Sequence, residues 1–254
     1  MNNYKLDEAN MKNYIETEKQ KIYYSIVRSN RKTIGISISQ SHGVKISAPR
    51  IVSDRQIAEV VRNKSSWIIE KLSHFEIIKS EVPQRKFTDG EMFLILGKEY
   101  PLKIVTHPEM TSSVDISNNC LVVSLSQNIC ENNSENKTEL IRNLIVNWYK
   151  KITMEVVSQR INFFSEKLDV TPSNLIIKEL KSIWGSCTGK NTININWKII
   201  MAPMSIVDYL VVHELTHIKI KNHSKHFWKL AESILPNYKE CSKWLKDNGH
   251  KLSL

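Results

Sequence analysis

Two histidines separated by three residues constrain the fold more than any other feature of this 254-residue chain. The segment HELTH, residues 213–217, has the HExxH pattern. On an α-helix, His213 and His217 lie on one face, about 6 Å apart along the axis. Two imidazoles in this arrangement can share one tetrahedral Zn²⁺, and Glu214 is positioned to hold a water molecule rather than the metal. The alternative is two packed histidines on an ordinary helix.

The neighbouring sequence indicates where this helix begins and ends. Residues 205–208 resemble a capping box, so we expect the helix to start at Ile206. A catalytic zinc site needs a third protein ligand and one open position. His223 reaches the shared face only if the helix ends before it. We expect Asn222 to end the helix in the left-handed conformation, and Ser224 to cap the next helix.

Three residues compete for the position of third ligand. His226 falls in the first turn of the next helix, and Glu232 would be the ligand in a glutamate-type zincin. We favour His223, because the corner between two helices leaves it free to turn back to the metal. The resulting pattern HELTHIKIKNH is similar to the three-histidine spacing of the metzincins, although Ile220 stands where they have glycine.

The remainder of the chain changes from strand-like to helical patterns. Short β-rich runs occupy residues 21–29, 32–40, 43–49, 91–97, 98–106, 114–117 and 121–126. The first three of these runs are separated by turn signals and are expected to form a meander. One amphipathic helix is expected from Ser53 to Lys79, with an apolar face that includes Phe75. The sequence shows no internal repeat.

A second long helix is expected from Thr138 to Leu168. Its apolar stripe comprises Leu140, Leu144, Ile145, Trp148, Ile152, Val156, Ile161 and Phe164. Residues 175–180 are strand-like, and two further strand-like arms meet at a Gly189 turn. In the second arm Ile193 and Ile195 alternate with asparagines, which is typical of a half-buried strand.

These patterns predict an α+β chain in three parts. Residues 1–20 form an N-terminal tail, and residues 21–130 form a β-rich part with one helix. Residues 138–254 contain a long helix, a β-hairpin with an edge strand, the HExxH helix and a C-terminal helix. The polar segment 127–137 between the last two parts is expected to be a loop.

Composition limits the cellular setting and the partners. Asp7 and Glu8 interrupt any signal-peptide pattern, and no run of 18 apolar residues occurs, so we expect a cytoplasmic protein without a membrane span. Four cysteines without paired spacing are expected to be free thiols. The net charge of +10 is compatible with nucleic-acid contact, but the lysines are spread along the whole chain, which favours a solvated basic surface.

Several motifs together resemble one known family. They are WGSC (184–187), NWKIIMAP (196–203), DYLVVHELTH (208–217), NHSKHFW (222–228) and LPNYKECSKWL (235–245). These motifs resemble the YgjP-like (DUF45) metallopeptidase family, a relative of the SprT-like zincins. A weaker similarity extends upstream through SNRKTIGISI, KSSWIIEKL and DGEMFLILGKEYPL. The family usually has arginine before WGSC, where this chain has Ile183, so no arginine role is carried over.

The resemblance implies a zincin-like fold for residues 138–254 and a specific site. His213, His217 and His223 would bind Zn²⁺, with Glu214 as the general base. The expected function is then a zinc metallopeptidase that hydrolyses a peptide or protein substrate by a metal-activated water. Tyr238 is a further candidate, as a donor to the oxyanion.

Two other expectations concern how substrates are bound. Zincins place an edge strand next to the metal helix, where it pairs with an extended peptide, and WGSC occupies that position. Trp184 is expected to be core and Cys187 a small buried thiol. The alternative function is a DNA-associated SprT-like protein that acts on, or docks to, proteins on nucleic acid. An idle metal-stabilised scaffold is disfavoured, because a structural zinc site has no use for Glu214.

Overall fold

The chain forms two compact units, which meet in the sequence between Glu81 and Val82. The computed structural model describes residues 13–18, 20–39, 42–81, 85–107, 111–126 and 137–254, and for residues 74–81 only the backbone. The expected α+β class is confirmed. The sequence indicates a boundary near residue 130, whereas the two units divide at residues 81–82. The strands between residues 92 and 126 belong to the second unit because they share a hydrophobic core with the C-terminal helices.

The first unit is a four-stranded sheet followed by two helices. Its elements are β1 (Asn13–Glu16), β2 (Lys21–Ser29), β3 (Gly35–Ser39), β4 (Gly43–Pro49), α1 (Asp54–Asn63) and α2 (Ser65–Glu81). The sheet order is β1-β2-β4-β3, and β2 pairs with β4 in parallel, so the expected meander is wrong. Strand β1 lies in the segment expected to be tail, of which residues 1–12 and 19 lie outside the described part of the chain.

The helical segment of this unit differs from the expectation by one break. Ser53 caps α1 in a capping box with Gln56. Helix α1 ends at Asn63, Lys64 forms its C-cap, and α2 begins at Ser65, so two helices replace the expected one. The side chain of Phe75, assigned to the apolar face, lies outside the described residues. Ile22, Ile46 and Ile57 are among the buried residues that join sheet and helix.

The second unit begins with a sheet that repeats the topology of the first. It contains β5 (Met92–Ile95), β6 (Lys98–His107), β7 (Ser113–Ser117) and β8 (Cys120–Ser126), in the order β5-β6-β8-β7. Both sheets have one central parallel pair and two antiparallel edge pairs in the same positions. The chain therefore contains an internal structural repeat that is not visible as a sequence repeat, because strand pairing follows alternation of apolar residues more than their identity.

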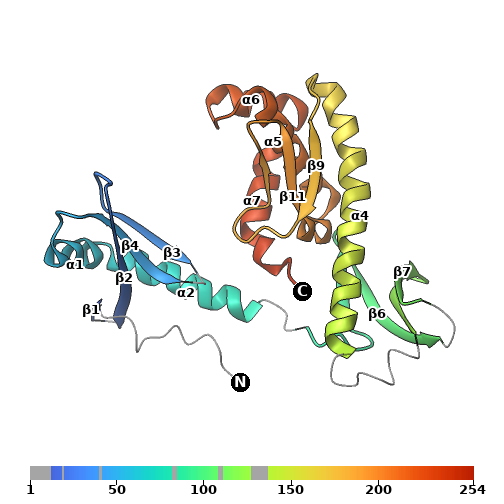
Figure 1. Cartoon of the computed structure of the whole chain (residues 1–254), viewed down its shortest axis with the longest axis horizontal. Coiled ribbons are helices and arrows are strands. Elements are labelled where there is room, and N and C mark those ends of the chain that lie inside the picture. The colour runs from blue at the N-terminus through green and yellow to red at the C-terminus, as the bar shows by residue number, and fades with distance from the viewer. Residues whose placement is uncertain (1–12, 19, 40–41, 82–84, 108–110, 127–136) are drawn as a thin grey trace. The chain divides into compact units, whose positions relative to one another are not determined.

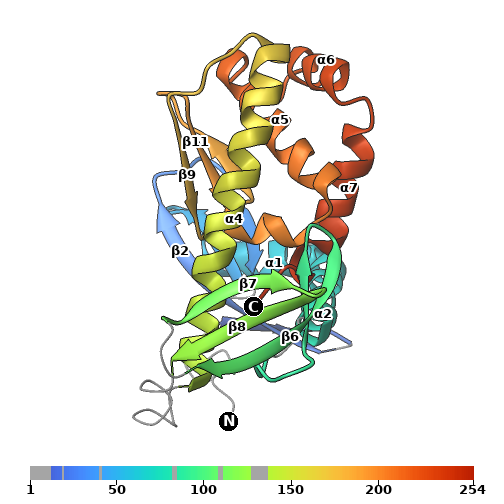
Figure 2. The ribbon, with the colours of Figure 1, turned by 90° about the vertical axis from the view of Figure 1, so that its right-hand side faces the viewer.

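Helix α4 (Lys137–Leu168) runs along the second unit and reaches from β6–β8 to strand β9 (Figure 2). Three residues of the predicted stripe, Ile145, Ile161 and Phe164, are buried as expected. Elsewhere the buried face lies one residue further along the helix, at Ile141, Tyr149, Thr153 and Val157. Apolar residues occur at both sets of positions, so periodicity alone did not select the buried set. The expected loop 127–136 before this helix lies outside the described residues.

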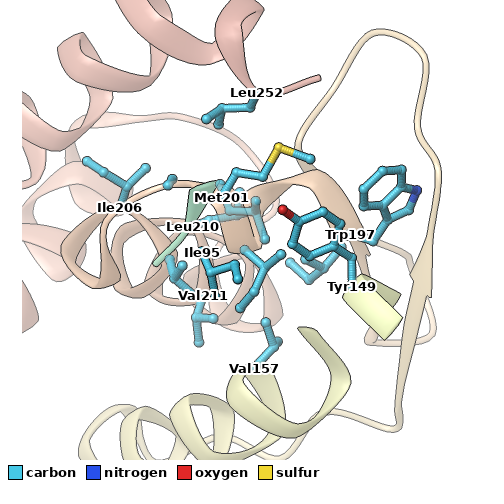
Figure 3. Packing of buried hydrophobic residues seen from close by; sticks show 14 of the residues in the cluster. Ile95, Tyr149, Val157, Trp197, Met201, Ile206, Leu210, Val211 and Leu252 are labelled. Carbon is cyan, nitrogen blue, oxygen red and sulfur yellow. The ribbon is translucent and has the colours of Figure 1, made fainter. Parts of the chain in front are cut away.

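Tyr149 connects α4 to the core that supports the site. Its ring stacks on Trp197 with centroids 5.9 Å apart, and its hydroxyl donates to the Leu94 carbonyl at 2.9 Å. Figure 3 shows the two rings side by side, with Leu210 and Val211 of the neighbouring helix in the same cluster. This cluster holds the helices of the second unit in place.

A three-stranded sheet follows α4 in the sequence and runs beside it in both views (Figures 1 and 2). Its order is β10-β11-β9, formed by β9 (Asn174–Lys178), β10 (Gly185–Cys187) and β11 (Thr192–Asn196). Strand β11 is buried on both faces rather than half-buried, because its asparagines have hydrogen-bond partners. Asn194 Nδ2 donates to Ser186 Oγ at 3.2 Å, and Asn196 Nδ2 donates to the Leu180 carbonyl at 2.9 Å.

The chain then enters its C-terminal helices. These are the 3-10 helix η2 (Trp197–Met201), α5 (Met204–Lys219), α6 (Lys225–Ile234), α7 (Tyr238–Asn248) and the 3-10 helix η3 (Gly249–Lys251). Helix α5 is central, since it contacts α4, α6, α7, η2 and β10. No helix in the described part of the chain is both long and apolar enough to cross a membrane. Cys120, Cys187 and Cys241 are free thiols, and Cys130 lies outside the described residues.

Candidate metal centre

Helix α5 carries the first two histidines and begins differently from the prediction. Its N-cap is Pro203 and no side chain caps it, so the capping box at residues 205–208 does not form. Asp208 instead forms a bidentate ion pair with Arg160 of α4, with Nη2 and Oδ2 3.0 Å apart. A carboxylate bound to a guanidinium in this way is not available to the helix N-terminus. The ion pair instead holds α5 against α4.

The turn after α5 brings the third histidine back toward the first two. The helix ends before His223, as expected, but already at Lys219 rather than at Asn222, and Ile220 has an extended backbone (φ −131°, ψ 104°). Asn222 is not left-handed, contrary to the prediction; its Oδ1 accepts a hydrogen bond from the Ser224 backbone N–H at 3.3 Å. Ser224 occupies the N-cap position of α6, without a side-chain hydrogen bond to the helix. The extended residue and this short turn reverse the chain at His223.

The three histidines converge on one point. One ligand atom from each of His213, His217 and His223 can be chosen so that all three lie within 4.8 Å of one another. The Nε2 atoms of His213 and His223 are 3.0 Å apart. Two nitrogens bound tetrahedrally to zinc at ~2.05 Å would be about 3.3 Å apart. The nitrogen set therefore fits a metal ion of this size.

The two competing ligands lie elsewhere. The described residues contain one group of three metal-binding side chains, and it includes neither His226 nor Glu232. His226 is exposed on α6. Glu232 forms an ion pair with Lys239, with Nζ and Oε1 3.7 Å apart. The arrangement favours His223 as the third residue of the site.

Burial keeps the imidazoles of His213 and His217 in the neutral form that binds metals. Burial, together with the neighbouring His217 and His223, lowers the pKa of His213 to about 3. Burial also lowers the pKa of His217. The ring N–H at Nδ1 of His217 donates to the Ile220 carbonyl at 3.1 Å, which leaves its Nε2 lone pair free. Neutral rings with a free lone pair are the state that a metal requires.

Glu214 is buried beside the histidines without a partner. It is 3% exposed, and its Oε2 atom has no hydrogen-bond partner among the described residues. Burial raises the pKa of this carboxyl to about 8. A buried carboxyl without a partner costs stability, and a pKa raised in this way is typical of functional sites. The site therefore combines three metal-binding nitrogens with a carboxyl group able to hold a proton near neutral pH.

The raised pKa of Glu214 predicts a pH dependence of stability in the metal-free protein. The folded state holds this proton up to about pH 8, whereas the unfolded state releases it near pH 4.5. Folding therefore binds a proton between these values, and the contribution of Glu214 to stability falls as pH rises through that window. Each pKa unit corresponds to about 1.4 kcal/mol.

We expect Glu214→Gln to unfold at a higher temperature than the wild type at pH 8 and to lose that advantage near pH 4.5. Thermal unfolding of both proteins in chelator across this range measures the difference. A constant difference in melting temperature at every pH would contradict the raised pKa.

Aromatic rings that no sequence pattern assigned to the site surround the histidines. Phe227 of α6 is fully buried and its ring contacts all three imidazoles. Trp228 stacks on His223, with ring centroids 5.6 Å apart and planes at 25°. These rings fix the orientation of the imidazoles. The signal in the sequence was their spacing, since Phe227 and Trp228 follow His223 by four and five residues and so return to the same site one helical turn later.

Tyr238 is joined to His223 through the ring of Trp228, which contacts both side chains. Its ring stacks on Trp228, with centroids 5.2 Å apart and planes at 16°, and it is 8% exposed. No ring contact joins Tyr238 to the three histidines within the described part of the chain. Trp228 thus separates the tyrosine ring from His223, and the role of Tyr238 as an oxyanion donor stays a prediction.

The predicted edge strand is present next to the metal helix. Strand β10, which contains most of WGSC, lies at the edge of its sheet and contacts α5. Trp184 packs partly buried against the main core, as expected. Cys187 is half-buried, with Lys221 Nζ 3.9 Å from its sulfur, and burial raises the pKa of its thiol. Cys187 is not part of the three-histidine group.

Comparison with known proteins identifies related sequences and structures. The model of the YgjP-like family, described as a metallopeptidase domain, matches residues 32–248. The crystal structure of the metallopeptidase zymogen abylysin of Pyrococcus abyssi is 22% identical over 36% of this chain and 93% of that chain, with a TM-score of 0.34. For the zymogen jannalysin of Methanocaldococcus jannaschii the values are 23%, 36%, 94% and 0.33. No curated protein matches the chain.

Proposed function

The chain belongs to the YgjP-like metallopeptidase family, and on that premise we propose that it is a zinc-dependent peptidase with its catalytic centre on α5. The observation that carries the proposal is the convergence of three imidazole nitrogens beside a buried carboxyl without a partner. Three histidines with an open fourth position are the donor set of a catalytic zinc. We assign His213, His217 and His223 as the ligands and Glu214 as the general base.

The chemistry divides between the ion and the protein. His213, His217 and His223 would hold the zinc ion, which when bound would lower the pKa of a water molecule toward ~7 and polarise the carbonyl of the scissile bond. Glu214 accepts the proton of the attacking water and delivers it to the leaving amine nitrogen. Burial raises the pKa of this carboxyl in the metal-free protein, and a general base whose pKa lies closer to neutrality can both take up and release a proton.

The remaining residues hold these groups in position. The Ile220 carbonyl orients His217 through Nδ1, and Phe227 and Trp228 pack against the rings. We propose that an extended peptide binds along the outer edge of β10, where backbone groups at the sheet edge can pair with a further strand. The substrate is then a peptide or protein segment without regular structure at the cleaved bond.

Metal analysis of purified protein tests the ligand assignment. We expect about one zinc per chain in the wild type, because three ligands and an open position bind one ion. His223→Ala should lose the metal. Glu232→Ala is the matched control, since Glu232 lies outside the three-histidine group and should leave the metal content unchanged. Elemental analysis of protein prepared without chelator gives the result.

Either of two outcomes would contradict the assignment. Loss of metal from Glu232→Ala with retention in His223→Ala would make the site a two-histidine, one-glutamate centre. Absence of stoichiometric metal from all three proteins would leave the histidines as packed side chains. The alternative function, association with nucleic-acid-bound proteins, rests on the net charge of +10 and on the resemblance to SprT-like zincins, and it stays a prediction.

A further inference from the structure

We propose that Gly185 is a positioning residue of the active site, because the space where its side chain would be is occupied by the carboxyl group of Glu214. A methyl carbon built on Gly185 would lie 2.7 Å from Glu214 Oε1 and 3.0 Å from both Cδ and Cγ. Carbon atoms in folded proteins do not approach an oxygen or carbon this closely without displacement. The inference rests on the proposed function, since it concerns the general base of that reaction.

The backbone of Gly185 does not itself require glycine. Among the described glycines, Gly43, Gly90 and Gly97 have positive φ angles, where a side chain is strained. Gly185 is not one of them, and it pairs with Ile195 in a regular antiparallel ladder. Any residue can adopt this conformation. What requires glycine at this position is therefore the side chain that faces it from α5.

Strand β10 is held in place, so it cannot move away from Glu214 to make room for a larger residue at position 185. The Asn196 backbone N–H donates to the Trp184 carbonyl at 2.8 Å, immediately before Gly185. Asn194 Nδ2 donates a hydrogen bond at 3.2 Å to Oγ of Ser186, the residue immediately after Gly185. The Trp184 ring is packed so closely against Gly249 that a methyl carbon there would lie 2.9 Å from Cζ2. Both neighbours of Gly185 are thus fixed to the rest of the unit.

The carboxyl group of Glu214 is the part that can move. It is the end of a flexible side chain, and its Oε2 has no hydrogen bond that would hold it in place. A methyl group on Gly185 would therefore push the carboxyl group aside at little cost to folding. A catalytic group displaced by about 1 Å can lower the rate by about 100-fold. The substitution should thus separate catalysis from stability.

The test uses the full-length protein with Gly185→Ala. We expect hydrolysis of fluorescein-labelled casein at saturating substrate to fall about 100-fold, with zinc content and melting temperature close to those of the wild type. Gly189→Ala is the matched control, because it lies in the turn between β10 and β11 and a methyl carbon there meets nothing within 4 Å. The control should retain the wild-type rate.

A second substitution tests whether the effect passes through Glu214. Glu214→Asp shortens the side chain by one carbon and so also displaces the carboxyl group. Because Gly185→Ala and Glu214→Asp then disturb the position of the same group, the double variant should lose less activity than the product of the two single losses. Multiplicative losses would overturn the inference, as would a wild-type rate for Gly185→Ala.

The crystal structure of Gly185→Ala decides the same inference without an activity measurement. A carboxyl group of Glu214 shifted from its wild-type position, with β10 unmoved, supports it. An unmoved carboxyl group with a displaced strand overturns it. A wild type that binds metal but hydrolyses no peptide would overturn the proposed peptidase function, whereas the crystal structure would still decide how Gly185 acts on Glu214.

Discussion

Glu214→Gln should abolish peptide hydrolysis while the protein keeps its metal. Glutamine has nearly the same size and shape as glutamate, so the imidazoles and the core around α5 stay in place. Its amide cannot accept a proton from the attacking water, and loss of a general base lowers rates by about 10²- to 10⁴-fold. The measurement is the rate of casein hydrolysis, with zinc content determined on the same samples.

Glu232→Gln provides the control for this variant. Glu232 is an exposed glutamate of α6 that pairs with Lys239, and it lies outside the three-histidine group. It should hydrolyse casein at the wild-type rate. Unaltered hydrolysis by Glu214→Gln would rule out Glu214 as the base. Loss of metal from Glu214→Gln would show instead that the carboxyl group binds the ion.

Removal of the metal should stop hydrolysis and destabilise the fold, and added Zn²⁺ should reverse both effects. An ion that binds only the folded state stabilises it by RT ln(1 + [L]/Kd), about 4 kcal/mol when its free concentration is 1,000 times Kd. The proposed ligands lie on α5 and in the turn before α6, so a bound ion would join two segments of the second unit. Thermal unfolding with and without chelator, and then with zinc, measures the effect.

His223→Ala separates metal binding from other effects of the chelator. With one of the three ligands removed, its melting temperature should be the same in the presence and absence of chelator. A wild-type melting temperature that does not respond to chelator would show that no metal stabilises the folded state. An equal response from both proteins would show that the chelator acts elsewhere.

Local patterns predicted the secondary structure well but not how the strands pair. Strands β2, β4, β6 and β8 lie where alternation of apolar residues placed them. The parallel pairing of β2 with β4, which skips β3 in the sequence, was not predicted. The contacts of a parallel pair join residues that are distant in the sequence. The same limit hid the repeated topology of the two sheets. The partial error on α4 has another origin, since two adjacent stripes were both largely apolar and packing against the core of the second unit, which includes Trp197, selected the buried one.

The sequence by itself determined the position and spacing of the candidate metal ligands. A helix with histidines four residues apart places both imidazoles on one face, and the next histidine can join them only if the helix ends first. These are local relations of backbone geometry, and the end of α5 at Lys219 agrees with them. The same motifs carried the resemblance to the YgjP-like family, which the match over residues 32–248 confirms.

The tertiary structure decided the environment in which these groups act. The burial of Glu214, the stacking of Trp228 on His223 and the approach of Gly185 to the carboxyl group all join residues from different elements. Desolvation and close packing depend on what surrounds a side chain, and no spacing along the chain encodes that. The sequence therefore indicated which residues form the site, whereas the folded core set the pKa of Glu214 and the space that Gly185 leaves for it.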